Sequence, residues 1–306
     1  MSNKANGRLT DAPRGEEGAQ ASAPEEKGFF KIIVHSFFVI PFLIVLFCVL
    51  LFTAVNLLTK EQHTVYDFLT DIKTGGLTKR WQGAFELSRI LANPKSVPQD
   101  ERFSSALIDA FEHAKYDDDR IRQYLALAMG RTGNPAFVHV LLSAVKEEKQ
   151  ENLASLIYSL GMLRQKEAVP VLRSFLDYPQ ARIRSVTVVA LGNIADENSG
   201  ALLRKALLDP EPNVQWGAAV SLAKMGDASG KTVLLNMLDR GYLSKFPEVD
   251  PEEQNDLILA VMDAVTPLKD STLNERIGEL ARSDVNRMVR SAALQIAQRN
   301  RSLNGK

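Results

Sequence analysis

Cysteine and net charge are what this sequence has least of. Cys48 is the only cysteine in 306 residues, so no disulfide can form within the chain and cysteine usage does not indicate the redox compartment. The 37 lysines and arginines are balanced by 37 aspartates and glutamates, which gives a formal net charge of +0. A chain without an overall basic field lacks the electrostatic footprint of nucleic-acid binding. We therefore expect no nucleic-acid partner.

Catalytic and metal-binding motifs are also missing from the sequence. It contains no Gly-x-Gly-x-x-Gly, no P-loop, no His-Glu-x-x-His and no Gly-x-Ser-x-Gly. The four histidines, His35, His63, His113 and His139, are scattered, and none pairs with another at the spacing of metal ligands. The sequence therefore predicts no catalytic residues, no metal site and no cofactor, and the chain is not expected to be an enzyme.

One long hydrophobic run lies near the start of the chain. Residues 37–55 are 19 consecutive residues without a charge. As a helix they extend about 28 Å, close to the ~30 Å hydrocarbon core of a bilayer. A cleaved signal peptide normally has an apolar core of about 7–15 residues and a small-residue cleavage site, and this run matches neither; a buried core helix is the other alternative. The run predicts an uncleaved transmembrane helix over residues 29–58, which would contact the lipid bilayer.

Composition divides the rest of the chain. Residues 1–28 are rich in Ala, Gly, Glu, Ser and Pro and have no apolar periodicity, so we expect a disordered tail. Residues 59–74 are expected to form a juxtamembrane linker or helix, and residues 75–306 a repeat domain. Lys27 and Lys31 flank the hydrophobic run closely, which slightly favours an inside N-terminus and a non-cytoplasmic repeat domain. Basic residues are nearly matched on the two sides, so the side of the membrane is left undecided.

The repeat has a period of 31 residues. Met129, Leu160, Leu191 and Leu222 occupy equivalent places in "AMGRTGN", "SLGMLRQ", "ALGNIAD" and "SLAKMGD". Weaker copies surround Leu87, Val265 and Ala297. Periods of 20–50 residues are typical of solenoids, in which stacked units share one continuous core. No stretch after residue 60 alternates with period two, so the sequence predicts an all-α fold: an α-solenoid of about seven helical hairpins.

Each unit reads as two helices. The first has apolar residues at helical spacing, such as Ile183, Val186 and Ala190, and the second follows a turn, as in "SGALLRKALL". The stretch "IRSVTVVALGNIADENSGALLRKALLD" (183–209) resembles a HEAT repeat of the short bacterial type found in phycobilisome lyase-like proteins. This resemblance implies a solenoid that binds proteins along an extended surface and carries no fixed catalytic residues. Together with the apolar run, it predicts a protein of the bacterial inner membrane. It also suggests an alternative function, a bilin lyase-like enzyme.

The resemblance implies that the second helix of each pair lines the concave side. We expect the exposed residues of these second helices to bind the partner; they are His139, Arg173, Arg204, Lys205 and Asn236. A charged face that only contacts solvent would show the same pattern.

An insertion lengthens one repeat. Val265 follows Leu222 by 43 residues, and the extra segment includes "RGYLSKFPEVDPEEQN" (240–255). Insertions in solenoids form loops that often lie on the binding face, which makes Tyr242, Leu243 and Phe246 further candidates for partner binding. The alternative is a loop that packs back on its own helices.

Polar residues recur in register with the repeat. Arginine stands seven residues before the reference position at four places: Arg80, Arg122, Arg184 and Arg290. Acidic residues stand five positions after it: Asp196, Asp227 and Asp270. We interpret both rows as a structural ladder between adjacent units rather than a ligand site, because Arg–carboxylate pairs help to fix register. Leu153 and Ile258 are expected to interrupt the arginine row.

These observations favour a non-catalytic, membrane-anchored, single-pass scaffold. Its expected partner is another protein, such as a subunit of a membrane complex.

Overall fold

The computed structural model describes residues 35–58 and 63–304. The predicted tail, 1–28, lies outside the described residues, as do the first part of the predicted membrane helix and the start of the predicted linker. The chain divides into two compact units, residues 1–62 and residues 63–306, which are described separately. Every regular element in the described ranges is helical, as the sequence predicts.

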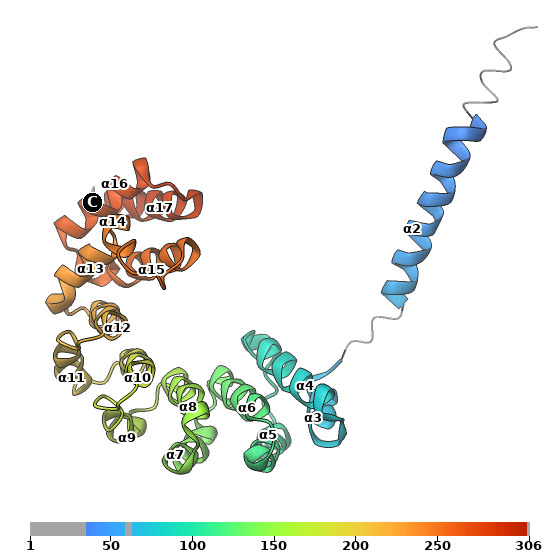
Figure 1. Cartoon of the computed structure of the whole chain (residues 1–306), viewed down its shortest axis with the longest axis horizontal. Helices are drawn as coiled ribbons and strands as arrows, with labels where there is room; N and C mark the ends of the chain where they lie inside the picture. Colours follow the sequence, from blue (N-terminus) through green and yellow to red (C-terminus); the bar gives the residue numbers. More distant parts are fainter. Residues whose placement is uncertain (1–34, 59–62, 305–306) are drawn as a thin grey trace, which may run out of the picture. The chain divides into compact units, whose positions relative to one another are not determined.

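The first unit contains one long apolar helix. A π-helical turn, η1 (His35–Val39), leads into α2 (Ile40–Leu58) (Figure 1). The window Phe37–Val55 is long and apolar enough to cross a membrane, and none of its side chains is buried against another part of the protein. Pro41 occupies the first turn of α2, where a missing N–H costs little.

The second unit is built from seven successive helical pairs in two rows (Figure 1). The inner row, on the inside of the curve, contains α4 (Leu77–Ile90), α6 (Asp119–Thr132), α8 (Gln150–Leu163), α10 (Ala181–Ile194), α12 (Pro212–Lys224), α15 (Pro251–Ala264) and α17 (Arg287–Asn304). The outer row contains α3 (Val65–Thr74), α5 (Glu101–His113), α7 (Val138–Glu147), α9 (Val169–Arg173), α11 (Ser199–Ala206), α13 (Lys231–Met237) and α16 (Ser271–Ser283).

Short elements connect the rows. The 3-10 turns are η2 (Pro94–Ser96), η3 (Ala114–Tyr116), η4 (Pro135–Phe137), η5 (Lys166–Ala168), η6 (Ala228–Gly230) and η7 (Thr266–Leu268), and α14 (Arg240–Leu243) follows α13. Aspartates start many of the helices: the carboxylate of Asp100 accepts from the backbone N–H of Phe103 at 2.9 Å, and that of Asp270 accepts from Leu273 at 3.1 Å. Such caps satisfy the unpaired N–H groups of a first turn, so the helix starts are encoded locally.

Glycines at the repeat period bring the inner helices together. Gly130, Gly161 and Gly192 occupy equivalent positions in α6, α8 and α10. A Cβ at Gly161 would lie 2.5 Å from the Cα of Ala190, and a Cβ at Gly192 would lie 2.3 Å from the Cβ of Ser221. Real Cβ atoms do not approach other atoms so closely, so only glycine permits this helix spacing. Close contact along one row and looser contact along the other bends the stack toward the glycine-bearing helices.

The solenoid unit begins earlier than the expected boundary at residue 75. It starts at His63, because α3 packs on α4 through the buried side chains Leu69 and Ile72. Most of the segment expected to be a juxtamembrane linker or helix, 59–74, is therefore helical and forms the outer helix of the first pair. The buried core runs continuously from Leu69 to Leu222, and a second cluster of buried residues continues from Trp216 to Ala293.

Candidate functional site

The regular stacking of the inner row changes after α12. The next inner helix, α15, is reached through the outer helix α13 and then through the inserted residues, 240–255, which form α14, the segment up to Asp250 and the first residues of α15. Trp216 of α12 packs edge-on against Tyr242 and Phe246 of this segment, with ring centroids 6.4 and 5.0 Å away. Leu243 is completely buried. The insertion therefore packs back on its own helices, which is the second of the two alternatives that the sequence allowed.

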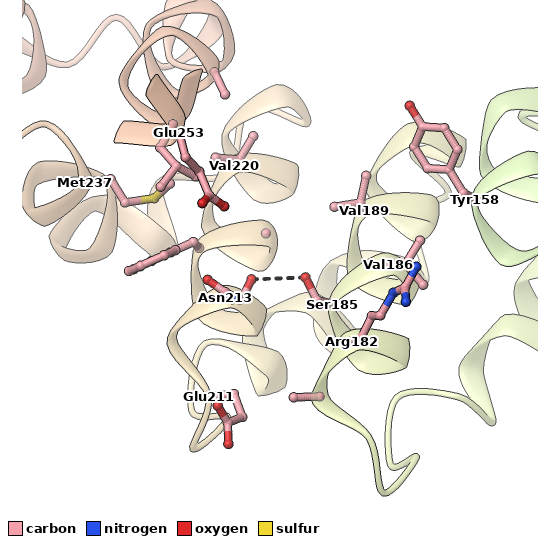
Figure 2. Close-up of a pocket in the computed structure, with 15 residues that line it drawn as sticks. Tyr158, Arg182, Ser185, Val186, Val189, Glu211, Asn213, Val220, Met237 and Glu253 are labelled. Carbon is pink, nitrogen blue, oxygen red and sulfur yellow. Dashed lines mark hydrogen bonds between the residues drawn. The ribbon is translucent and has the colours of Figure 1, made fainter. Parts of the chain in front are cut away.

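A groove opens where the inner helices diverge. It encloses about 560 Å³ and lies between α10 and α12 on one side and α15 on the other, with Tyr158 of α8 at one edge (Figure 2). The apolar side chains on its walls are Val186, Val189, Val220, Met237 and Leu257. These residues are partly or fully shielded by their neighbours yet face the open space, so the groove presents apolar surface on the inner side of the solenoid.

Charged groups flank the apolar lining. Arg182 of α10 stands on one wall, and the carboxylate of Glu253 of α15 lies on the opposite side, above α12 (Figure 2). Between them the Ser185 hydroxyl donates a hydrogen bond to the backbone carbonyl of Asn213 at 3.3 Å, which ties α10 to the start of α12. This arrangement can receive an extended or helical segment with an apolar centre, because the charged groups lie at the edges and the Ser185 hydroxyl is already hydrogen-bonded.

The groove is not formed by the residues that the sequence analysis selected. The second helices were expected to line the concave side, and this expectation is wrong: the exposed residues His139, Arg173, Arg204, Lys205 and Asn236 lie on outer helices (Figure 1). The helices that carry the close-packing glycines occupy the inside of the curve instead. Partner binding by the outer residues stays a prediction.

Two of these outer residues already have ionic partners. Arg204 forms a salt bridge with Asp227, and Lys205 lies 3.3 Å from Asp177. Both pairs join neighbouring outer helices. Exposed pairs of this kind contribute about 0–1 kcal/mol each, so they fit a solvated outer face as well as a binding surface.

The arginine row links successive units. Arg122 is buried and donates to the carbonyl of Phe111 at 2.6 Å and to Glu148 at 2.5 Å. Arg184 donates to the Tyr178 carbonyl at 2.9 Å and makes two 2.8 Å bonds to the Asp209 carboxylate.

The arginines at the two ends of the row make some of the same contacts. Arg80 donates to the Ile72 carbonyl at 2.9 Å and pairs with Asp117. Arg290 donates to the Asp284 carbonyl at 2.6 Å. Each arginine thus holds the outer helix before it, and the first three also hold the loop after the next outer helix.

The aspartate row is a separate set of contacts. Asp196 lies 3.7 Å from Lys166, Asp227 pairs with Arg204, and Asp270 lies 2.7 Å from Lys231. None of the three contacts the arginine row, because each caps the outer helix or turn that follows it. The pKa of Asp270 is lowered by its hydrogen bond from Lys231, and the pKa of Asp227 is lowered first by its hydrogen bond from Ser229. The single ladder expected from the sequence is therefore two parallel ones.

Apolar residues stand where the arginine row was expected to break. Leu153 is buried and Ile258 is completely buried. Beside Leu153, the Asn152 amide donates to Asp119 at 3.2 Å and to Glu148 at 3.1 Å, so an uncharged side chain bridges the same units.

A sequence signal for the groove does exist. The segments "SVTVVALG" in α10 and "GAAVSLA" in α12 are apolar nearly all the way round the helix. A helix that is apolar all round has more apolar surface than one core face can cover. The surplus faces the groove, as Val186, Val189 and Val220 show. Among the described residues, no three His, Cys, Asp or Glu side chains are grouped so that they could hold a metal ion.

A family model for HEAT repeats matches residues 104–192 and 175–243. This part of the chain consists of HEAT repeats. The match covers most of α5 and all of α6 to α14, including α10 and α12 of the groove but not α15. A comparison with curated proteins gave no match.

Solved structures of similar backbone include the complex of CpcE and CpcF of phycocyanin lyase from Nostoc sp. PCC7120. The match has 15% sequence identity and a TM-score of 0.42, and it covers 79% of this chain and 96% of that chain. An engineered protein matches at 15% identity and a TM-score of 0.36, covering 78% and 96%. Human deoxyhypusine hydroxylase in complex with glycerol matches at 15% and 0.33, covering 77% and 96%. All three are distant in sequence and in backbone overlap, and they carry no information about the ligands of this chain.

Proposed function

We propose that this chain is a non-catalytic scaffold, anchored in a bacterial inner membrane by α2, that binds a segment of another protein in the groove between α10, α12 and α15. The observation that carries the proposal is the groove itself, an apolar depression of about 560 Å³ on the inner row with charges only at its edges. Solvent-exposed apolar concavities of this kind are typical of interaction sites.

The chemistry of the lining supports binding rather than catalysis. The titratable side chains that line the groove are Tyr158, Arg182, Glu211 and Glu253, on three inner helices and one connection. The Ser185 hydroxyl donates to a backbone carbonyl and has no base beside it. A nucleophile needs an adjacent base and an acid–base pair needs two groups in reach of one substrate atom, and this lining offers neither.

The apolar helix supports the membrane anchor. Nothing in the described structure covers Phe37–Val55, and the window has a mean hydropathy of 3.0. Tethering would raise the effective concentration of the solenoid for other proteins of the same membrane, which favours a subunit of a membrane complex as the partner. A protease-accessibility assay on intact and opened cells would determine on which side the solenoid lies.

Site-specific photocross-linking tests the proposal. A photoreactive amino acid at Val220, inside the groove, or at Tyr158, on its edge, should give a discrete adduct with the partner in membranes. The same amino acid at His139 on the outer row should give none, because α7 lies outside the groove. Adducts from His139 and not from Val220 would move the binding face to the outer helices. Covalent attachment of a chromophore to an acceptor protein by the purified chain would contradict the non-catalytic part of the proposal.

A further inference from the structure

The wall formed by α15 carries four acidic side chains that have no ionic partner among the described residues. Glu252, Glu253, Asp256 and Asp263 are all exposed, and none forms a salt bridge with a described residue. The preceding carboxylate, Asp250, is occupied as the helix cap and accepts from the backbone N–H groups of Glu252 and Glu253 at 2.8 Å.

Several acidic groups in other units are paired within the chain. Glu148 is paired with Arg122, Asp209 is held by Arg184, and Asp284 is held by Arg240 at 2.7 and 2.8 Å. The α15 carboxylates differ from these because no basic side chain of a neighbouring unit reaches them. The repulsion among these carboxylates is screened by solvent and salt, or is relieved by a molecule that binds there.

The position of the acidic side chains relates them to the groove. Glu253, Leu257 and Ala260 follow one another at helical spacing and all line the groove. Asp256 and Asp263 lie on the adjacent stripe of the same helix, so they flank the groove along its length. The negative charge therefore borders an apolar depression rather than an open convex face.

The opposite wall carries an exposed arginine. Arg182 of α10 is exposed and lines the groove (Figure 2), and the structure records neither a hydrogen bond nor a salt bridge from its guanidinium to a described residue. Val186 and Val189 of α10 and Val220 of α12 form the apolar floor of the groove. The groove thus presents acidic side chains along α15, this apolar floor, and Arg182 together with the exposed Glu211 on the side of α10 and α12.

Taking the proposed function as given, we propose that the occupant is a basic amphipathic segment of a partner protein, with cationic side chains against α15, apolar side chains on the valines, and an acidic residue opposite Arg182. Complementary charge on the two walls determines the direction in which the segment lies and excludes acidic segments. The apolar floor supplies most of the affinity, while the rim charges supply selectivity and a fast, salt-dependent encounter.

Selection from a random peptide library on the full-length chain in detergent tests this inference. Recovered peptides should be enriched in lysine and arginine beside apolar residues. In the variant Glu253→Lys/Asp256→Lys, binding of these cationic peptides should weaken roughly tenfold at low salt, and the difference should shrink as salt rises. The matched control Glu167→Lys/Glu197→Lys makes the same change in net charge outside the groove, and it should leave the peptides bound as before.

A groove-filling variant separates this inference from the proposed function. Ala260 is exposed and lines the groove, so Ala260→Trp should fill it without disturbing the core and should abolish binding of all selected peptides. Peptides that A260W displaces but that are neutral or acidic would overturn the inference and leave the proposed function standing. Peptides that A260W does not displace would overturn both. Self-association of the full-length chain that Glu253→Lys/Asp256→Lys reverses would show that the occupant is a second copy, and it would likewise overturn the inference.

Discussion

Helical glycines allow a prediction with opposite signs at two sites, one in the inner row and one in the outer row. Gly161→Ala adds a Cβ that would lie 2.5 Å from the Cα and 2.7 Å from the Cβ of Ala190. Both atoms belong to a rigid neighbouring helix, so α8 and α10 have to separate. Overpacking of this kind costs about 1–3 kcal/mol, and the gain in helix propensity offsets about 0.5–1 kcal/mol of it. We therefore expect the free energy of unfolding to fall by about 1–2 kcal/mol.

Gly278→Ala is the matched control. Gly278 lies inside α16, and an added Cβ would meet only the mobile end of Arg282, at 3.7 Å. This variant should gain up to about 1 kcal/mol from helix propensity alone. For a domain of this size 1 kcal/mol corresponds to a change of about 2–4 °C in Tm. Thermal melts of the full-length chain in detergent, followed by circular dichroism, should show a lower Tm for G161A and an unchanged or higher one for G278A. A higher Tm for both variants would refute the idea that close helix contact sets the spacing of the inner row.

Three further predictions concern ion pairs and the anchor. Arg122→Ala should destabilise the solenoid by about 3–5 kcal/mol in urea unfolding, because it leaves the buried Glu148 carboxylate uncompensated. The hydrogen bonds from Arg184 lower the pKa of Asp209. The pair should therefore stabilise the fold above the ordinary aspartate pKa of about 3.9 and lose that contribution as pH falls through the lowered pKa. Asp209→Asn should remove this part of the pH dependence of the free energy of unfolding, and an identical pH profile for the variant would contradict the assignment. Deletion of residues 37–55 should move the chain from the membrane pellet to the supernatant after ultracentrifugation, and a variant that still pellets with membranes would contradict the anchor.

The repeat could be predicted from the sequence because one periodic signal runs through it. The 31-residue spacing of Met129, Leu160, Leu191 and Leu222 reports helices that are equivalent in the stack, and these residues are completely buried. Periodicity identifies which residues share an environment, so it predicts the helical pairs and their number. The start of the solenoid was less visible, because α3 is short and precedes the regular repeats.

The side of the curve could not be read from periodicity alone. Both rows have apolar faces, so the pattern of Leu, Val and Ala does not distinguish them. The distinction lies in residue size at the contact between neighbouring helices, which Gly130, Gly161 and Gly192 reveal at the same 31-residue period. Predicting the curvature requires knowing which face of each helix meets the next one, and that is a property of the packed stack.

The groove depends on contacts between residues far apart in the sequence. The insertion around Tyr242 and Phe246 could be recognised by its broken period, and its aromatic residues suggested a binding loop. In the structure they support Trp216 from the side, and the insertion separates α12 from α15. The proposed binding surface is therefore the gap between α12 and α15, formed by helices on either side of the insertion rather than by the inserted residues themselves.

The central claim is that the inner row, and not the outer one, binds the partner. It is tested most directly by recovering partner protein from membranes with two matched tryptophan variants of the full-length chain, Ala260→Trp on α15 and Ala201→Trp on α11, both at exposed alanines. Only the first lines the groove. We predict that A260W loses most of the partner recovered by the wild-type chain and that A201W retains it. Retention by A260W together with loss by A201W would contradict the claim.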